Sequence, residues 1–231
     1  MKKILKSKEE KNIFSIIIMI IVGCIVMAIV DRFIRPVYFI KSLIKFIFFL
    51  IIPIIYFKVT KNKEFKEIFK IKKENIGKYL LLGLGVYIFI LGSYYITQNF
   101  YNFSGVVGVI EKNFRISKDN FVIISLYIAF CNSLLEEIFF RGIGFHMLSK
   151  YVSKKYAYLF SASTFAIYHM AIIDGWFSPI IFILIILGLL FAGYIFDYID
   201  DKEENIYNSW MVHMFANFAI NTVGFILFGI I

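Results

Sequence analysis

Long runs of Ile, Leu, Val and Phe alternate with short charged clusters along the whole chain. A helix needs about 20 apolar residues to cross about 30 Å of hydrocarbon, so each run of that length predicts one membrane-spanning helix. Transmembrane strands need only about ten residues that alternate in polarity, and the runs here are longer and do not alternate. The pattern predicts an all-α, polytopic transmembrane helix bundle of about seven spans, at 13–30, 37–57, 79–97, 121–147, 156–173, 177–196 and 207–231.

The composition agrees with a membrane protein. Of the 231 residues, 60% are hydrophobic and 18% are charged, whereas an average soluble chain is about 45–50% apolar and about 25% charged. This balance excludes a disordered chain, a disulfide framework and a soluble nucleotide-binding fold. Because the chain has no internal repeat, proline-rich linker or low-complexity tract, we expect residues 1–231 to form a single membrane-embedded domain.

The net charge of +9 is explained by topology. If the N-terminus is cytoplasmic, 18 of the 25 Lys and Arg residues fall on the cytoplasmic side, as the positive-inside rule requires. We therefore expect a cytoplasmic N-terminus, membrane lipid as a partner and no nucleic-acid binding. The basic segment 61–75 is either an amphipathic helix at the headgroups or a solvated loop. The first run stays apolar through Val30, which favours a retained span over a cleaved signal.

Ionisable residues inside the spans are few, and each is a functional candidate because a charge at mid-bilayer costs at least about 2.5–3.5 kcal/mol. Lys41 and Lys45 are expected to snorkel from a span end. His146 and Asp197 are expected to be bystanders near the inner boundary. The remaining candidates cluster in the last four spans: Glu136, Glu137, Arg141, His169 and His213, with Asn132 and Asn217 beside them.

Helical spacing separates these candidates by role. Glu137 and Arg141 are four residues apart and share a face, so an ion pair between them would be structural. Glu136 points about 100° away from Glu137 and has no obvious local partner, which makes it the candidate for chemistry. His213 and Asn217 are also four apart and present an imidazole and an amide side by side.

The depth of these groups in the membrane is similar. Glu136 and His169 each lie fourteen residues from a basic boundary, about 21 Å at 1.5 Å per residue, on antiparallel neighbours. Asn217 lies about 18 Å and His213 about 12 Å in on the last span. The four groups therefore meet in one cavity if the fourth span continues past Arg141 to about Met147. Two alternatives remain: the polar side chains only hold the helices together through hydrogen bonds, or they serve proton or ion transport. The convergence of these groups nevertheless favours hydrolytic chemistry.

Three short motifs follow in order on these spans: Glu136-Glu137-x-x-x-Arg141, Phe165-x-x-x-His169 and His213-x-x-x-Asn217. This arrangement resembles the CPBP family of intramembrane proteases, which contains the type 2 CAAX prenyl endopeptidases and the Abi-like bacteriocin-processing or immunity proteins. The likeness covers residues 121–221. The N-terminal spans, within 1–120, match only in being hydrophobic.

The resemblance implies an intramembrane endopeptidase that hydrolyses a peptide bond in a hydrophobic or lipid-anchored membrane peptide. It implies that Glu136 is the general base that activates water, that His169 holds this water, and that His213 and Asn217 stabilise the oxyanion. Glu137 and Arg141 would brace these groups.

A Zn²⁺ ion on Glu136, His169 and His213 remains open beside a metal-free mechanism, although no HExxH motif is present. A non-catalytic membrane scaffold or a bacteriocin-immunity protein is the alternative function. The bias toward Lys, Ile, Asn and Phe is typical of an AT-rich bacterial genome, so we expect a bacterial cytoplasmic membrane.

Overall fold

The computed structural model describes residues 2–62, 64–71 and 75–231, with side chains from Glu9 onward in the first helix. All regular structure in these ranges is helical, which confirms the predicted all-α class. The α-helices and the 3₁₀ or π segments (η) are α1 (Lys2–Ile29), η1 (Val30–Ile34), α2 (Tyr38–Phe46), η2 (Ile47–Ile51), α3 (Ile52–Val59), η3 (Glu64–Phe69), α4 (Ile76–Thr97), α5 (Ser104–Phe114), α6 (Lys118–Tyr127), η4 (Ile128–Asn132), α7 (Ser133–Glu136), η5 (Glu137–Met147), η6 (Leu148–Lys150), α8 (Lys154–Ile173), α9 (Pro179–Glu203) and α10 (Ile206–Leu227).

Seven continuous helical stretches in the described ranges are long and apolar enough to cross a membrane, as predicted. The protein is therefore an integral membrane protein. The fourth stretch runs from Lys118 to Lys150, so the helix does continue past Arg141. The sixth stretch ends at Glu203 rather than near residue 196, and the seventh ends at Leu227.

Two segments between the spans differ from a simple loop. In the basic segment 61–75, η3 is a short 3₁₀ helix, and its Phe65 and Ile68 are buried. The ring of Phe65 stacks on Phe57 with centroids 4.4 Å apart, so this part packs on the bundle and is neither a long surface helix nor a solvated loop. Residues 63 and 72–74 of that segment lie outside the described residues.

The helix α5 was not predicted, and its apolar face packs against α6 and the end of α10.

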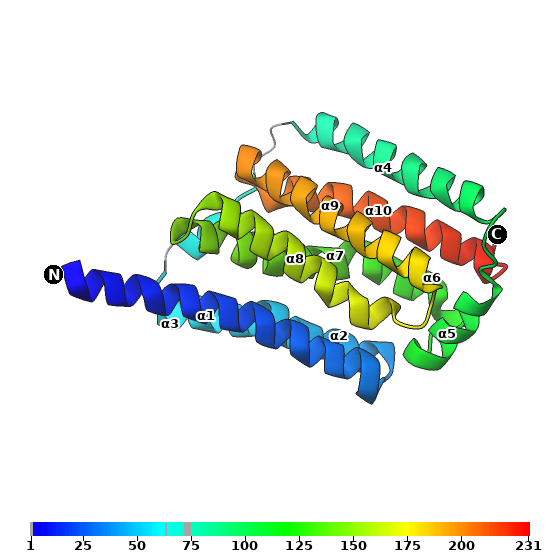
Figure 1. The fold of residues 1–231 in the computed structure, drawn as a ribbon, viewed down its shortest axis with the longest axis horizontal. Helices are drawn as coiled ribbons and strands as arrows, with labels where there is room; N and C mark the ends of the chain where they lie inside the picture. Colours follow the sequence, from blue (N-terminus) through cyan, green and yellow to red (C-terminus); the bar gives the residue numbers. More distant parts are fainter. Residues whose placement is uncertain (1, 63, 72–74) are drawn as a thin grey trace.

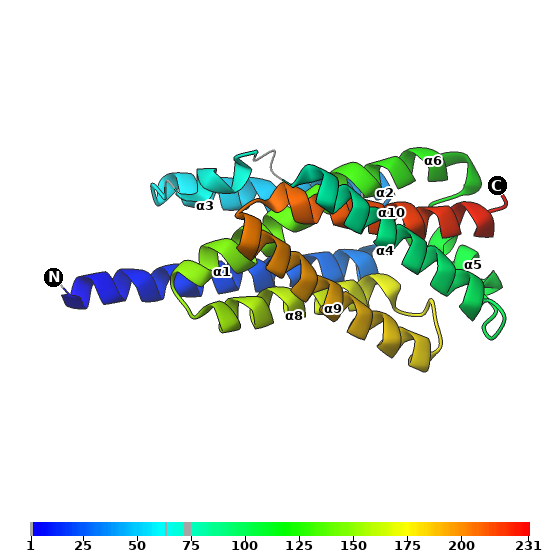
Figure 2. The same cartoon turned by 90° about the horizontal axis from the view of Figure 1, so that it is seen from above.

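The bundle is arranged around the helix that carries the first motif. In Figure 1, α4 lies along one edge and α1 to α3 along the other, with α8, α9 and α10 between them. Figure 2 shows the two chain ends at opposite ends of the bundle. The N-terminal helices meet the motif helix at an aromatic contact, where Phe49 of η2 stacks on Phe139 of η5 at 3.9 Å. This contact joins the N-terminal spans to the helices that carry the motifs.

The crossing of α8 and α9 depends on a glycine. A Cβ at Gly193 would lie 2.9 Å from the backbone Cα of Ala162, whereas a Cβ at Gly188 on the same helix would meet nothing within 4 Å. We therefore expect Gly193→Ala to lower the free energy of unfolding by about 1–3 kcal/mol through overpacking. Gly188→Ala should leave it unchanged or raise it by about 1 kcal/mol through helix propensity.

Thermal unfolding of the two variants in the same detergent tests this expectation. Equal melting temperatures for the two variants would contradict the close approach of α8 and α9.

Candidate active site

The motif helix is not a regular α-helix where it carries the motif. Between α6 and η6 its hydrogen bonding alternates between α and π turns, and Glu136 is the last residue of α7, immediately before the π-helical η5. π turns are rare and occur frequently at functional sites. They widen the helix locally and change which side chains share a face. Spacing arguments based on 3.6 residues per turn do not anticipate this change.

Glu136 faces two imidazoles from two other helices. Its Oε2 lies 3.8 Å from Nε2 of His169 on α8 and 3.6 Å from Nε2 of His213 on α10. The Glu136 side chain is 3% exposed, and that of His169 is 16% exposed. The structure thus brings Glu136, His169 and His213 together in the interior of the bundle, and this cluster is most open beside His169.

The other nitrogen of each imidazole is held by a hydrogen bond. Nδ1 of His169 donates to the carbonyl oxygen of Phe165 at 2.8 Å, and Nδ1 of His213 donates to Oε1 of Glu137 at 2.8 Å. Because both partners are acceptors, each Nδ1 carries a proton, and in the neutral ring Nε2 then presents a lone pair. Three acceptors, Oε2 and the two Nε2 atoms, consequently face one another. A water molecule between them can donate its two protons to two of these three acceptors at a time.

The first motif also forms the expected ion pair. Nε of Arg141 lies 3.5 Å from Oε2 of Glu137, and both side chains are fully buried. The guanidinium also lies over the rings of Phe165 and Phe196, at 4.2 and 4.9 Å from their centroids. Phe165, the aromatic residue of the second motif, therefore packs on the arginine of the first.

The expectation that Asp197 is an interfacial bystander was wrong. Its side chain is fully buried, with Oδ1 at 3.6 Å from Nε of Arg141, and Ser161 donates a hydrogen bond to the same Oδ1 at 2.7 Å. The helix α9 continues beyond the predicted span end at Phe196 and carries Asp197 inside the bundle. His146, the other expected bystander, is only partly buried on η5.

The expectation that Lys41 and Lys45 snorkel was also wrong. Lys41 Nζ lies 2.5 Å from Oδ1 of Asp31, and Lys45 Nζ lies 2.5 Å from Oε1 of Glu136. Both lysine side chains are buried, at 10% and 2% exposure. An acid on another helix removes the need to reach water, because the pair shares the desolvation penalty. Glu136 thus has a cationic partner that its own helix does not supply.

Asn217 lies on α10 one turn beyond His213, but its amide is engaged elsewhere. Nδ2 of Asn217 donates to the carbonyl of Ile128 at 3.3 Å, and Nδ2 of Asn221 donates to the carbonyl of Ser125 at 2.8 Å. These carbonyls belong to the motif helix where its hydrogen bonding changes to the π pattern. In this structure the two amides therefore dock α10 on the motif helix, and Asn217 does not join the other three groups.

The arrangement does not suit the zinc site that the sequence left open. Two imidazoles and a carboxylate are suitable Zn²⁺ ligands. In the described part of the chain, however, no three His, Cys, Asp or Glu side chains are placed so that they could hold a metal ion. The other oxygen of Glu136 already pairs with an ammonium group, that of Lys45.

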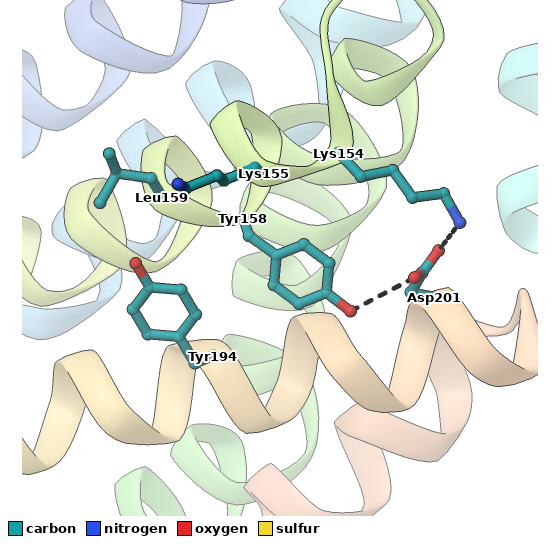
Figure 3. Close-up of a pocket in the computed structure, with 6 residues that line it drawn as sticks. All are labelled: Lys154, Lys155, Tyr158, Leu159, Tyr194 and Asp201. Atoms are coloured by element: carbon teal, nitrogen blue, oxygen red, sulfur yellow. Dashed lines mark hydrogen bonds and ion pairs between the residues drawn. The ribbon is translucent and has the colours of Figure 1, made fainter.

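A separate cavity of about 540 Å³ lies between α8 and α9 (Figure 3). It is lined by Lys154, Lys155, Tyr158, Leu159, Tyr194 and Asp201. Within it, Asp201 pairs with Lys154 at 2.5 Å and accepts a hydrogen bond from Tyr158 at 3.4 Å. None of the motif side chains lines this cavity, so we do not assign the chemistry to it.

Residues 118–219 match the protein family described as Type II CAAX prenyl endopeptidase Rce1-like. The matched range contains all three motifs and the buried cluster that they form. No curated protein and no solved structure matches the chain. This match confirms the resemblance of residues 118–219 to the CPBP proteases, the group that contains the type II CAAX prenyl endopeptidases.

Proposed function

We propose that the protein is an intramembrane endopeptidase in which Glu136 activates a water molecule against a peptide bond of a hydrophobic or lipid-anchored substrate. The observation that supports this proposal most directly is that Oε2 of Glu136 lies 3.8 Å from Nε2 of His169 and 3.6 Å from Nε2 of His213. The family supports a membrane protease of the CAAX type. The buried position of the cluster favours a substrate that arrives through the lipid.

The proposed reaction is a hydrolysis in two proton transfers. Water hydrogen-bonds to Oε2 and to an imidazole Nε2, and Glu136 removes one proton as the oxygen attacks the carbonyl carbon. When the C–N bond breaks, Glu136 returns this proton to the leaving amine. The products are a new carboxylic acid and a new amine, which ionise to a carboxylate and an ammonium group, and no other reactant is needed.

Stabilisation of the oxyanion is proposed for His213 and Asn217. His213 is held by the hydrogen bond from its Nδ1 to Oε1 of Glu137, which orients Nε2 toward the reacting groups, and Nε2 donates to the oxyanion when it carries a proton taken from the water. Asn217 contributes only after its amide rotates away from the carbonyl of Ile128, to which it now donates. Substrate binding would have to drive that rotation.

A cleavage assay in proteoliposomes tests the proposal. The probes are two quenched-fluorescent peptides, one S-farnesylated near its C-terminus and one unlipidated with a hydrophobic segment of about 20 residues. The wild-type protein should cleave at least one probe, with a single new terminus by mass spectrometry. The double variant Glu136→Gln/His169→Gln should cleave neither. If the wild-type protein cleaves neither, or if the double variant matches the wild type, the endopeptidase proposal fails and a scaffold role is favoured.

A further inference from the structure

The side chain of Lys45 completes the cluster from outside the motifs. Lys45 lies on α2, which is not part of the family-matched range 118–219. Its Nζ donates hydrogen bonds to Oε1 of Glu136 at 2.5 Å and to Oδ1 of Asn132 at 2.6 Å. The side chains of Lys45 and Glu136 are 2% and 3% exposed. An ion pair this buried has little contact with solvent on either side.

Asn132 closes a triangle with these two residues. Its Nδ2 donates to Oε1 of Glu136 at 3.0 Å, while its Oδ1 accepts from Lys45. Both hydrogen bonds to the carboxylate thus go to Oε1, and Oε2 faces the imidazoles of His169 and His213. The two oxygens have different surroundings: one is bound to donors and the other faces acceptors.

Among the residues that the structure describes, no acid other than Glu136 lies within ion-pair distance of Lys45. The other buried lysine of α2, Lys41, pairs with Asp31 instead of Glu136. The ammonium of Lys45 also lies about 5 Å from two aromatic rings, 5.1 Å from the centroid of Phe49 and 5.0 Å from that of Tyr168. Rings at this distance add cation–π attraction and keep water away from the pair.

We infer that Lys45 is a positioning residue for the proposed hydrolysis: it fixes Oε1 of Glu136 so that Oε2 is presented, as a carboxylate, to the water that the imidazoles hold. This inference rests on the proposed function. An unpaired carboxylate in a low-dielectric interior is strongly disfavoured, so the ammonium supplies the counter-charge that a base requires there. The N-terminal spans are then part of the active site and do more than anchor the protein.

A merely structural ion pair would have a different signature. It would change stability when broken and would leave turnover of the folded protein unchanged. A positioning role changes kcat, because a displacement of about 1 Å in a reacting group costs about 100-fold, while KM stays nearly constant. The comparison of kcat with KM in folded variants therefore separates the two roles.

The experiment compares Lys45→Met and Lys45→Arg with the matched control Lys41→Met, in proteoliposomes with the farnesylated and the unlipidated probe. Lys41 is one turn away on the same helix and is also buried in an ion pair, but it does not contact Glu136. We expect Lys45→Met to lower kcat about 100-fold with KM changed by less than about threefold. Lys45→Arg keeps the charge and should retain kcat within about tenfold of the wild type.

Lys41→Met should keep the wild-type kcat even where its melting temperature falls. Lys45→Gln keeps a hydrogen-bond donor and removes the charge, so its kcat should fall as in Lys45→Met. This variant is used in place of Lys45→Met if Lys45→Met is not monodisperse. A folded Lys45→Met or Lys45→Gln with kcat within twofold of the wild type would overturn the inference while leaving the endopeptidase intact. A loss of turnover in Lys41→Met equal to that in Lys45→Met would also overturn it. An inactive wild-type protein would count against the proposed function itself.

Discussion

The Glu136→Gln variant is expected to cleave the farnesylated or unlipidated probe at least about 1,000-fold more slowly than the wild-type protein. The amide has the size of the carboxylate and still accepts the hydrogen bonds of Lys45 and Asn132 at one oxygen. It has no basic oxygen to take a proton from water. The loss should therefore appear in kcat, and initial rates at saturating probe measure it.

The same substitution is expected to lower stability, since it leaves the ammonium of Lys45 buried without its counter-charge. Removal of one partner of a buried pair costs about 3–5 kcal/mol. The double variant Glu136→Gln/Lys45→Met removes both charges and should regain most of the melting temperature while it stays inactive. This rescue of stability without rescue of activity separates loss of the base from loss of the fold. A single variant that turns over within tenfold of the wild type would show that Glu136 is not the base.

The spans were predictable because the bilayer imposes length and apolarity on each crossing helix. Seven runs of that kind in the sequence correspond to seven helical stretches of membrane-spanning length in the described ranges. The helix α5 was not predictable in this way, because its 11 residues mix Gly, Glu, Lys and Asn with the apolar positions. Its place is set by packing against Phe121 on the next helix and against Phe228, which is far away along the chain. Contacts between residues this far apart are not visible in a local pattern.

The part of the site that lies within motifs was predictable from spacing and depth. Those arguments placed Glu136 and His169 at one level on neighbouring helices, and the structure has them 3.8 Å apart. Asp197 was misjudged because it directly follows the predicted end of its span, where a charge is usually solvated. Lys45 was misjudged because its long side chain was expected to reach the end of the predicted span 37–57, although it lies well inside that span. Charge balance was the available signal: Glu136 had no partner on its own helix, and Lys45 was a cation inside an apolar run.

The second large effect is expected at Arg141. Arg141→Met should lower the free energy of unfolding by about 3–5 kcal/mol, because it leaves Glu137 and Asp197 buried together without a cation. Both carboxylates are fully buried, and the guanidinium lies between them and over the ring of Phe165. For a chain of this size, the melting temperature should fall by roughly 10 °C, as measured by thermal unfolding in detergent.

The matched control is Arg32→Met. Arg32 also pairs with an aspartate, Asp174, but the two side chains are 49% and 44% exposed, and an exposed pair contributes only about 0–1 kcal/mol. Arg141→Lys keeps the charge but loses the planar stacking on Phe165, so its melting temperature should lie between those of the wild type and Arg141→Met. If Arg141→Met had the same melting temperature as Arg32→Met but no cleavage activity, Arg141 would act in the reaction itself. If the melting temperature instead falls in Arg141→Met but not in Arg32→Met, the role of the arginine is structural. It then holds Glu137 in place and, through Glu137, the ring of His213.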